Sequence, residues 1–309
     1  MRQSSKTIGQ AVENLSVSSP STDPISYTAQ IVAAKRAIEQ SLSIPLFSDP
    51  YAATLAGDEV ESLLAKWRQV AERQGRSLED VIAKRTRYIA IRTRFFDDLL
   101  LAALPQVSEP QVVILGSGLD TRAYRLSWPV TTNLYEVDVP GVLDYKANAL
   151  RHVNPTCRHH LIAGDLENFQ TGWVARLLEA GLRQDFPTIW ILEGVVMYLP
   201  ESSVHSLLRT VAALSCPGSV LGMDAVKSGS IRAGQSAKNA DRGRVVRHWQ
   251  FGCDEPQQFL RAYGWDAEVS QPQNVTIAHG RYPESMPVTA EVGGHQQERG
   301  VWLVKARKD

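Results

Sequence analysis

Apolar residues recur at helical spacing through the first third of the chain, whereas short apolar runs alternate with amphipathic stretches in the remainder. The first part, residues 27–104, is expected to be helical throughout. Ser77 followed by Asp80 is typical of a capping box at the start of its longest helix, and the prolines at 105 and 110 end that helix. The helices expected there cover residues 29–41, the stretch from the Asp49-Pro50 turn to 56, and residues 60–74 and 78–104.

Seven short apolar runs follow, each of strand length, with helix-like segments such as 173–180 and 202–213 between some of them. Strand and helix signals in alternation indicate βαβ units, so we expect a doubly wound, mostly parallel sheet closed by an antiparallel edge. An Arg-, Lys- and Gly-rich segment at 228–250 is either a loop near the site or a solvated connection. The predicted strands are 112–115, 134–137, 160–163, 188–192, 219–223, 267–270 and 302–305.

Composition narrows the class of protein. Lysine plus arginine equals aspartate plus glutamate at 33 each, and nucleic-acid binders usually carry a basic excess, so no nucleic-acid partner is expected. No apolar stretch is long enough to span a bilayer, so no membrane partner is expected either. The 3 cysteines lack metal-ligand or disulfide spacing, which predicts no metal site and a reducing, cytoplasmic location.

A glycine-rich turn follows the first predicted strand. The run from Val112 to Leu115 leads directly into Gly116-Ser117-Gly118, where glycine allows a ligand to approach the backbone. We expect a helix N-terminus with free N–H groups to follow. Ligands of open α/β sheets bind beyond the carboxyl ends of the strands, so this turn predicts a binding site, although an ordinary turn would carry the same glycines.

Acidic residues follow three further strands of the predicted sheet. Asp138 lies 22 residues after Gly116, where a carboxylate can accept hydrogen bonds from both ribose hydroxyls; a helix cap before Pro140 is the alternative, and Glu136 is a second candidate for the ribose. A dinucleotide fingerprint needs a small third residue, and Thr121 occupies that position, which disfavours NAD.

The other two acids complete the predicted nucleoside site. Asp165 can bond an adenine amino group while Leu166 covers the ring, unless Asp165 only forms a turn. Glu193 ends the fourth strand, where it could bond a ligand amino group or form a structural ion pair. Burial of an unpaired carboxylate is costly, so Glu193 should have a cationic partner.

Three motifs in this order resemble the leucine carboxyl methyltransferase family. They are Leu115-Gly-Ser-Gly-Leu-Asp-Thr-Arg-Ala-Tyr-Arg-Leu126, Tyr135-Glu-Val-Asp-Val-Pro140 and Glu193-Gly-Val-Val-Met-Tyr-Leu-Pro200. The resemblance extends over about residues 29–265 and is greatest to the bacterial branch and the polyketide or peptide O-methyltransferases. It implies a class I Rossmann-like methyltransferase fold, with a helical cap over 26–105 and a methyltransferase core with variable acceptor-binding insertions over 106–309. Residues 1–25 are rich in Ser, Thr, Gln and Pro and are expected to form a flexible tail.

The resemblance also implies the cofactor, S-adenosyl-L-methionine, and the residues that hold it. Lys35 and Arg92 match the family's basic residues for the methionine carboxylate, and Glu193 matches the residue for its amino group. The remaining cofactor positions that match the family are Gly116, with Ser117 and Gly118 in the same turn, Asp138, Asp165 and Leu166.

The acceptor is expected to be a small molecule methylated on a carboxyl or hydroxyl oxygen, as in secondary metabolism. In the family the residue matching Tyr198 points toward the acceptor, although a core aromatic would fit the same pattern. A carboxylate needs no base, whereas an alcohol does; His248 is the first candidate, with Tyr198 or Asp120 as substitutes. His152, His159 and His160 are expected at the surface.

Other functions remain open from sequence alone. Ser117 and Leu119 depart from the Gly-Ala-Gly-Met-Asp-Thr loop of the phosphatase-methylating members, and residues 228–300 match no part of the family pattern. Both departures disfavour a protein C-terminal carboxyl as the acceptor. A NAD-dependent dehydrogenase and a non-catalytic cofactor-binding protein are weaker alternatives.

Overall fold

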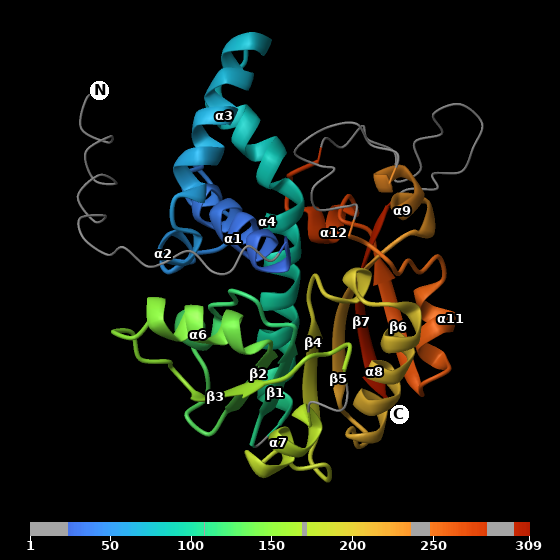
Figure 1. Ribbon diagram of the computed structural model, residues 1–309. Coiled ribbons are helices and arrows are strands. Elements are labelled where there is room, and N and C mark those ends of the chain that lie inside the picture. The colour runs from blue at the N-terminus through green and yellow to red at the C-terminus, as the bar shows by residue number, and fades with distance from the viewer. Residues whose placement is uncertain (1–23, 108, 169–171, 236–247, 283–299) are drawn as a thin grey trace.

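A seven-stranded sheet with helices on both faces forms the centre of the computed structural model (Figure 1). The structure describes residues 24–107, 109–168, 172–235, 248–282 and 300–309; most of the predicted tail and the middle of 228–250 lie outside these ranges. The strands are β1 Gln111–Leu115, β2 Asn133–Asp138, β3 Arg158–Ala163, β4 Thr188–Leu192, β5 Val220–Val226, β6 Trp265–Ser270 and β7 Val301–Lys308.

The strand order is β3-β2-β1-β4-β5-β7-β6. β1 to β5 pair in parallel, which confirms the predicted doubly wound sheet. The antiparallel strand is β7, and it lies between β5 and β6, so that β6 is the outer strand. All seven predicted strands are present.

Helices cover the sheet and extend beyond it. The longest, α4, begins at the Ser77 cap, whose hydroxyl accepts a hydrogen bond from the Asp80 N–H, as predicted. None of the described helices is long and apolar enough to cross a lipid bilayer. They are α1 Pro24–Glu39, α2 Ala52–Ala56, α3 Glu59–Gln74, α4 Leu78–Ala103, α5 Arg122–Arg125, α6 Pro140–Ala149, α7 Trp173–Glu179, α8 Glu201–Ala213, α9 Ser228–Gln235, α11 Pro256–Arg261 and α12 Val275–Ala278, with 3-10 turns η1 Leu104–Gln106 and η3 Val196–Tyr198.

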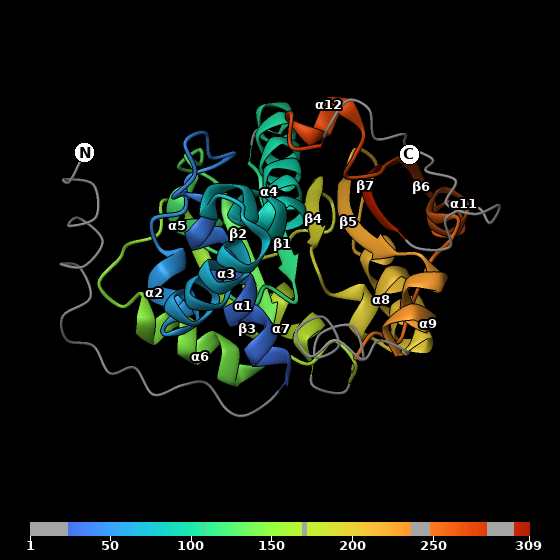
Figure 2. The same cartoon turned by 90° about the horizontal axis from the view of Figure 1, so that it is seen from above.

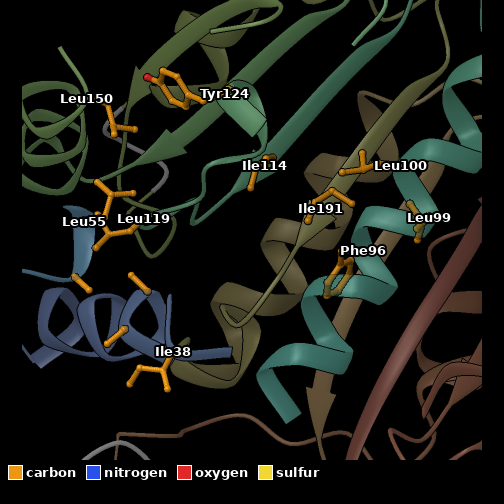
Figure 3. Close-up of a cluster of buried hydrophobic side chains, with 14 of the residues drawn as sticks. Ile38, Leu55, Phe96, Leu99, Leu100, Ile114, Leu119, Tyr124, Leu150 and Ile191 are labelled. Atoms are coloured by element: carbon orange, nitrogen blue, oxygen red, sulfur yellow. The ribbon is translucent and has the colours of Figure 1, made fainter. Parts of the chain in front are cut away.

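Alternation along the buried strands divides the core in two. Val112 and Ile114 of β1 face a cluster shared with α1, α3, α4 and α6, whereas Val113 and Leu115 face one shared with α7, α8 and α11. Strands β1 and β4 are buried along their whole length, as expected of central strands covered on both faces. Figure 3 shows Phe96 of α4 close to Ile191 of β4, so α4 joins the N-terminal helices to the sheet.

The N-terminal helices lie over the β1–β2 half of the sheet when the molecule is seen from above (Figure 2). A Cβ placed on Gly118 would be 3.7 Å from the Cβ of Ala29, which puts α1 directly over the glycine turn. Leu55 of α2 lies beside Leu119 of the same turn (Figure 3). The glycine turn after β1 is therefore enclosed by α1 and α2.

Candidate functional site

The glycine turn adopts a conformation that only glycine accepts without strain. Gly116 and Gly118 have φ angles of 66° and 52°. A Cβ on Gly116 would lie 2.5 Å from Cγ2 of Val195 and 3.6 Å from Cδ1 of Leu166, so this residue is also close to two neighbouring loops. The Ser117 hydroxyl is buried and has no hydrogen-bond partner among the described residues. A buried, unpaired hydroxyl is costly, which favours a ligand at this turn.

The helix expected after the turn differs from the prediction. α5 has only four residues, Arg122–Arg125, and the Asp120 carboxylate accepts a hydrogen bond from the Arg122 N–H at 2.6 Å. A helix therefore follows the turn as predicted, but it is short, and its first N–H group is bonded to Asp120 rather than free.

Asp138 faces the glycine turn. Its Oδ2 accepts a hydrogen bond from the Gly118 N–H at 2.6 Å, and its Oδ1 accepts one from the Val139 N–H at 2.7 Å. Burial raises the pKa of the Asp138 carboxyl, while the two backbone donors oppose that shift. The carboxylate is thus held in one orientation beside the glycine turn.

The second ribose candidate, Glu136, has another role. It is completely buried, bonds the Lys146 ammonium, and has His159 Nε2 at 3.3 Å from its Oε1. Because Glu136 is committed to this internal cluster, the structure does not favour it as a cofactor ligand. His159, expected at the surface, has a side chain only 6% exposed.

Asp165 and Leu166 follow β3 at the same edge of the sheet. Leu166 is buried near Gly116. The Asp165 Oδ1 accepts a hydrogen bond from the Glu167 N–H at 2.8 Å, which is the turn geometry considered as the alternative. The turn role of Asp165 is therefore confirmed, and its bond to an adenine amino group stays a prediction.

Arg92 and Glu193 meet at the tip of β4. Arg92 Nε donates to Glu193 Oε1 at 2.9 Å, although the two residues are far apart in sequence, and Arg122 Nη1 lies 2.8 Å from Glu193 Oε2. Glu193 therefore has two cationic partners, Arg92 and Arg122, where one was expected. Lys35 lies half-buried on α1, the helix that covers the glycine turn.

A fully buried acid that sequence reasoning missed completes this group. Asp224 of β5 lies 3.2 Å from Arg92 Nη1, accepts a hydrogen bond from the Tyr88 hydroxyl at 2.7 Å, and accepts another from the Gly194 N–H. Burial lowers the pKa of Arg92, but the charges of Asp224 and Glu193 outweigh that effect and raise it. The signal in the sequence was a single acid within the apolar run 220–226.

Arg122 and Arg125 continue the charged group from Arg92 and Glu193 toward α1 and α2. Arg122 Nε bonds Asp97 at 2.7 Å and also pairs with Asp120. Although burial raises the pKa of Asp120, Arg122 and then Arg125 lower it to about 2. Asp120 is consequently ionised and committed to Arg122.

A buried bridge links α1 to the glycine turn. Arg36 bonds Asp49 at 2.8 Å and the Leu119 carbonyl at 2.6 Å, and Asp49 also accepts a hydrogen bond from Thr121. Asp49, predicted only as a turn residue, is completely buried. These contacts hold α1 against the turn.

Of the two predicted catalytic residues, Tyr198 lies at the site. Burial raises the pKa of its hydroxyl, whereas the neighbouring polar groups of Trp249 and Thr28 and the charge of Arg92 lower it. Tyr198 thus joins η3, α1 and the Arg92 group. His248 is exposed in the turn before Trp249, so the structure places Trp249 against Tyr198 and His248 toward solvent. Among the described residues, no cluster of three or more His, Cys, Asp and Glu could hold a metal ion.

Known proteins match both the sequence and the fold. The model of the leucine carboxyl methyltransferase family matches residues 29–212. A Mycobacterium tuberculosis protein named "Putative S-adenosyl-L-methionine-dependent methyltransferase" is 40% identical over 212 residues, and the match spans 66% of each chain, slightly under two thirds of that relative. A Mycolicibacterium smegmatis protein with a similar name is 36% identical over 281 residues, 86% of this chain and 91% of the relative.

A solved structure shows the same fold at low sequence identity. The crystal structure of a DUF574 family protein from Streptomyces avermitilis aligns with a TM-score of 0.56 at 13% identity, covering 91% of this chain and 97% of the other. The family model spans the glycine turn, Asp138 and the Glu193 motif, the same motifs that carried the resemblance in the sequence. The chain belongs to the leucine carboxyl methyltransferase family.

Proposed function

We propose that the protein transfers a methyl group from S-adenosyl-L-methionine to a carboxyl oxygen of a small molecule of the polyketide or peptide class. The cofactor is the one that the curated relatives of this family carry in their names. The observation that supports the proposal is the pairing of Arg92 and Glu193 at the strand tips, 2.9 Å apart. Opposite charges side by side suit a ligand that carries a carboxylate and an ammonium group.

The residues at the site fit each part of that cofactor. Asp138 would bond the ribose and Leu166 would cover the adenine. Gly116 and the Ser117 hydroxyl, which has no partner within the described part of the chain, would lie between them. Arg92 of α4 and Lys35 of α1 would hold the methionine carboxylate, and Glu193 would bind the amino group. Asp165, Gly118 and the other turn atoms would complete the adenosine site.

The acid–base state of the site favours a carboxylate acceptor over an alcohol. When bound, the cofactor would supply an electrophilic methyl group, and transfer to a carboxylate would form a C–O bond as the S–C bond breaks and a neutral thioether leaves. An alcohol must lose a proton, but Asp120 has a pKa of about 2 and is ion-paired, and His248 is exposed. Burial keeps Tyr198 protonated at neutral pH, so it can donate a hydrogen bond to an acceptor oxygen but cannot remove a proton.

Two measurements test this function. Calorimetry with S-adenosylhomocysteine and with NAD should give binding of the first ligand only; binding of NAD alone would support a dehydrogenase. Transfer of a labelled methyl group to candidate carboxylic acids should then yield a product that releases labelled methanol in mild alkali. Esters hydrolyse under these conditions and ethers do not, so an alkali-stable product would contradict the carboxyl acceptor.

A further inference from the structure

We propose that Asp224 and Tyr88 are positioning residues for Arg92: they fix its guanidinium in the orientation that receives the carboxylate of the cofactor. This inference rests on the proposed function, because it assigns a purpose to a group that contacts Arg92 at the cofactor site. Asp224 lies on β5 and Tyr88 on α4, outside the motifs that carried the family resemblance.

Asp224 is held at both of its oxygens. The Gly194 N–H donates to Oδ1, while the Tyr88 hydroxyl donates to Oδ2 at 2.7 Å and Arg92 Nη1 lies 3.2 Å from the same oxygen. With both oxygens bonded, the carboxylate cannot rotate. It therefore presents a fixed acceptor to Arg92.

Arg92 is in turn held at two points of its planar group. Nε bonds Glu193 at 2.9 Å and Nη1 bonds Asp224, so two carboxylates from neighbouring strands define the plane of the guanidinium. Tyr88 and Arg92 are four residues apart on α4 and so lie on one face of that helix. Glu193 alone would leave the guanidinium free to turn about one bond.

Arg92 and Asp224 are both buried, which makes each the partner that the other requires. The side chain of Asp224 is 0% exposed and that of Arg92 is 9% exposed, so neither charge is solvated and each needs the other. Asp224 is not adjacent in sequence to any predicted cofactor residue; it acts through Arg92. The loss of Asp224 should consequently affect ligands that carry a carboxylate and spare ligands that lack one.

The test compares two ligands by calorimetry. S-adenosylhomocysteine carries the amino acid portion, whereas 5′-methylthioadenosine retains the adenosine and lacks that portion. Asp224→Asn should lower the affinity for S-adenosylhomocysteine about tenfold or more, because this ligand needs an oriented Arg92. The affinity for 5′-methylthioadenosine should stay within about twofold of the wild type. Tyr88→Phe should show the same pattern with a smaller loss, and provides a milder variant if Asp224→Asn does not fold.

A double-mutant cycle tests whether the effect passes through Arg92. In an Arg92→Ala background, Asp224→Asn should cause no further loss of S-adenosylhomocysteine affinity. Equal weakening of both ligands, or full additivity with Arg92→Ala, would overturn the positioning role while leaving the cofactor assignment intact. A wild-type protein that binds neither ligand would overturn the cofactor assignment and this inference together.

Discussion

The most direct perturbation of the Arg92 group is Gly194→Ala. Gly194 has a φ of 69°, and a Cβ there would lie 2.8 Å from Arg92 Nη1 and 3.3 Å from its Cζ and Nη2. The guanidinium sits at the end of a flexible side chain, but its bonds to Glu193 and Asp224 prevent it from moving aside freely. The substitution should therefore displace Arg92 or break one of those bonds.

The expected magnitudes follow from these two effects. A positive φ costs an alanine about 1–2 kcal/mol, which lowers the melting temperature by a few degrees in a chain of this size. Loss of one well-oriented charge-assisted bond to the ligand costs about 1.5–3 kcal/mol, or roughly 10- to 150-fold in affinity for S-adenosylhomocysteine. Gly194→Ala should show both effects.

Gly75→Ala is the matched control. Gly75 ends α3 with a φ of 59° and a Cβ there would meet no atom within 4 Å, so the substitution causes only the conformational cost. Thermal melting and calorimetry with S-adenosylhomocysteine measure the two effects in both variants. If Gly194→Ala loses stability as Gly75→Ala does but binds the ligand as tightly as the wild type, the proposed contact between Arg92 and the cofactor is refuted.

Three further predictions concern the acceptor, acid stability and the N-terminal helices. Tyr198→Phe should lower kcat/KM for the acceptor roughly tenfold without changing the affinity for S-adenosylhomocysteine. If the wild-type rate instead rises at alkaline pH and the variant lacks that rise, Tyr198 acts as a base. The pKa of Asp120 is about 2 in the folded protein against an ordinary 3.8, so its ionisation should contribute roughly 2 kcal/mol to the free energy of unfolding above pH 4. This contribution should be lost as the pH falls through 2. Urea unfolding of Asp120→Asn should lack this pH dependence, and an equal change of unfolding free energy with pH in both proteins would contradict the prediction. Limited proteolysis near residues 20–50 should slow when S-adenosylhomocysteine is added and not when NAD is added, whereas identical cleavage rates would exclude ordering of this region by the cofactor.

Local patterns predicted the central strands well because β1 and β4 are short, buried apolar runs. The fifth run shows where such patterns fail. Prediction ended that strand at residue 223, before the acid, whereas β5 continues through Asp224 to Val226. The strand can continue because Arg92 and Tyr88, from a helix more than a hundred residues earlier, neutralise and bond the carboxylate.

Partners distant in sequence also explain the other residues whose roles in the structure differ from those predicted. The motif order located Glu193 and Asp138 correctly at the strand tips, and the cost of burial predicted a cation beside Glu193. The neighbouring sequence did not indicate that Glu136 would pair with Lys146, or that Asp49 would be buried against Arg36 and Thr121. Each of those roles depends on a pairing that forms only when the tertiary structure does.

The position of β7 has a consequence for synthesis of the protein. β7 is the hydrogen-bonded neighbour of both β5 and β6, yet it follows both of them along the chain. As the nascent chain leaves the ribosome, β5 emerges with one edge unpaired and β6 emerges without any strand partner, because β7 has yet to be translated. This half of the sheet therefore presents open strand edges that can associate wrongly with other strands until β7 is made.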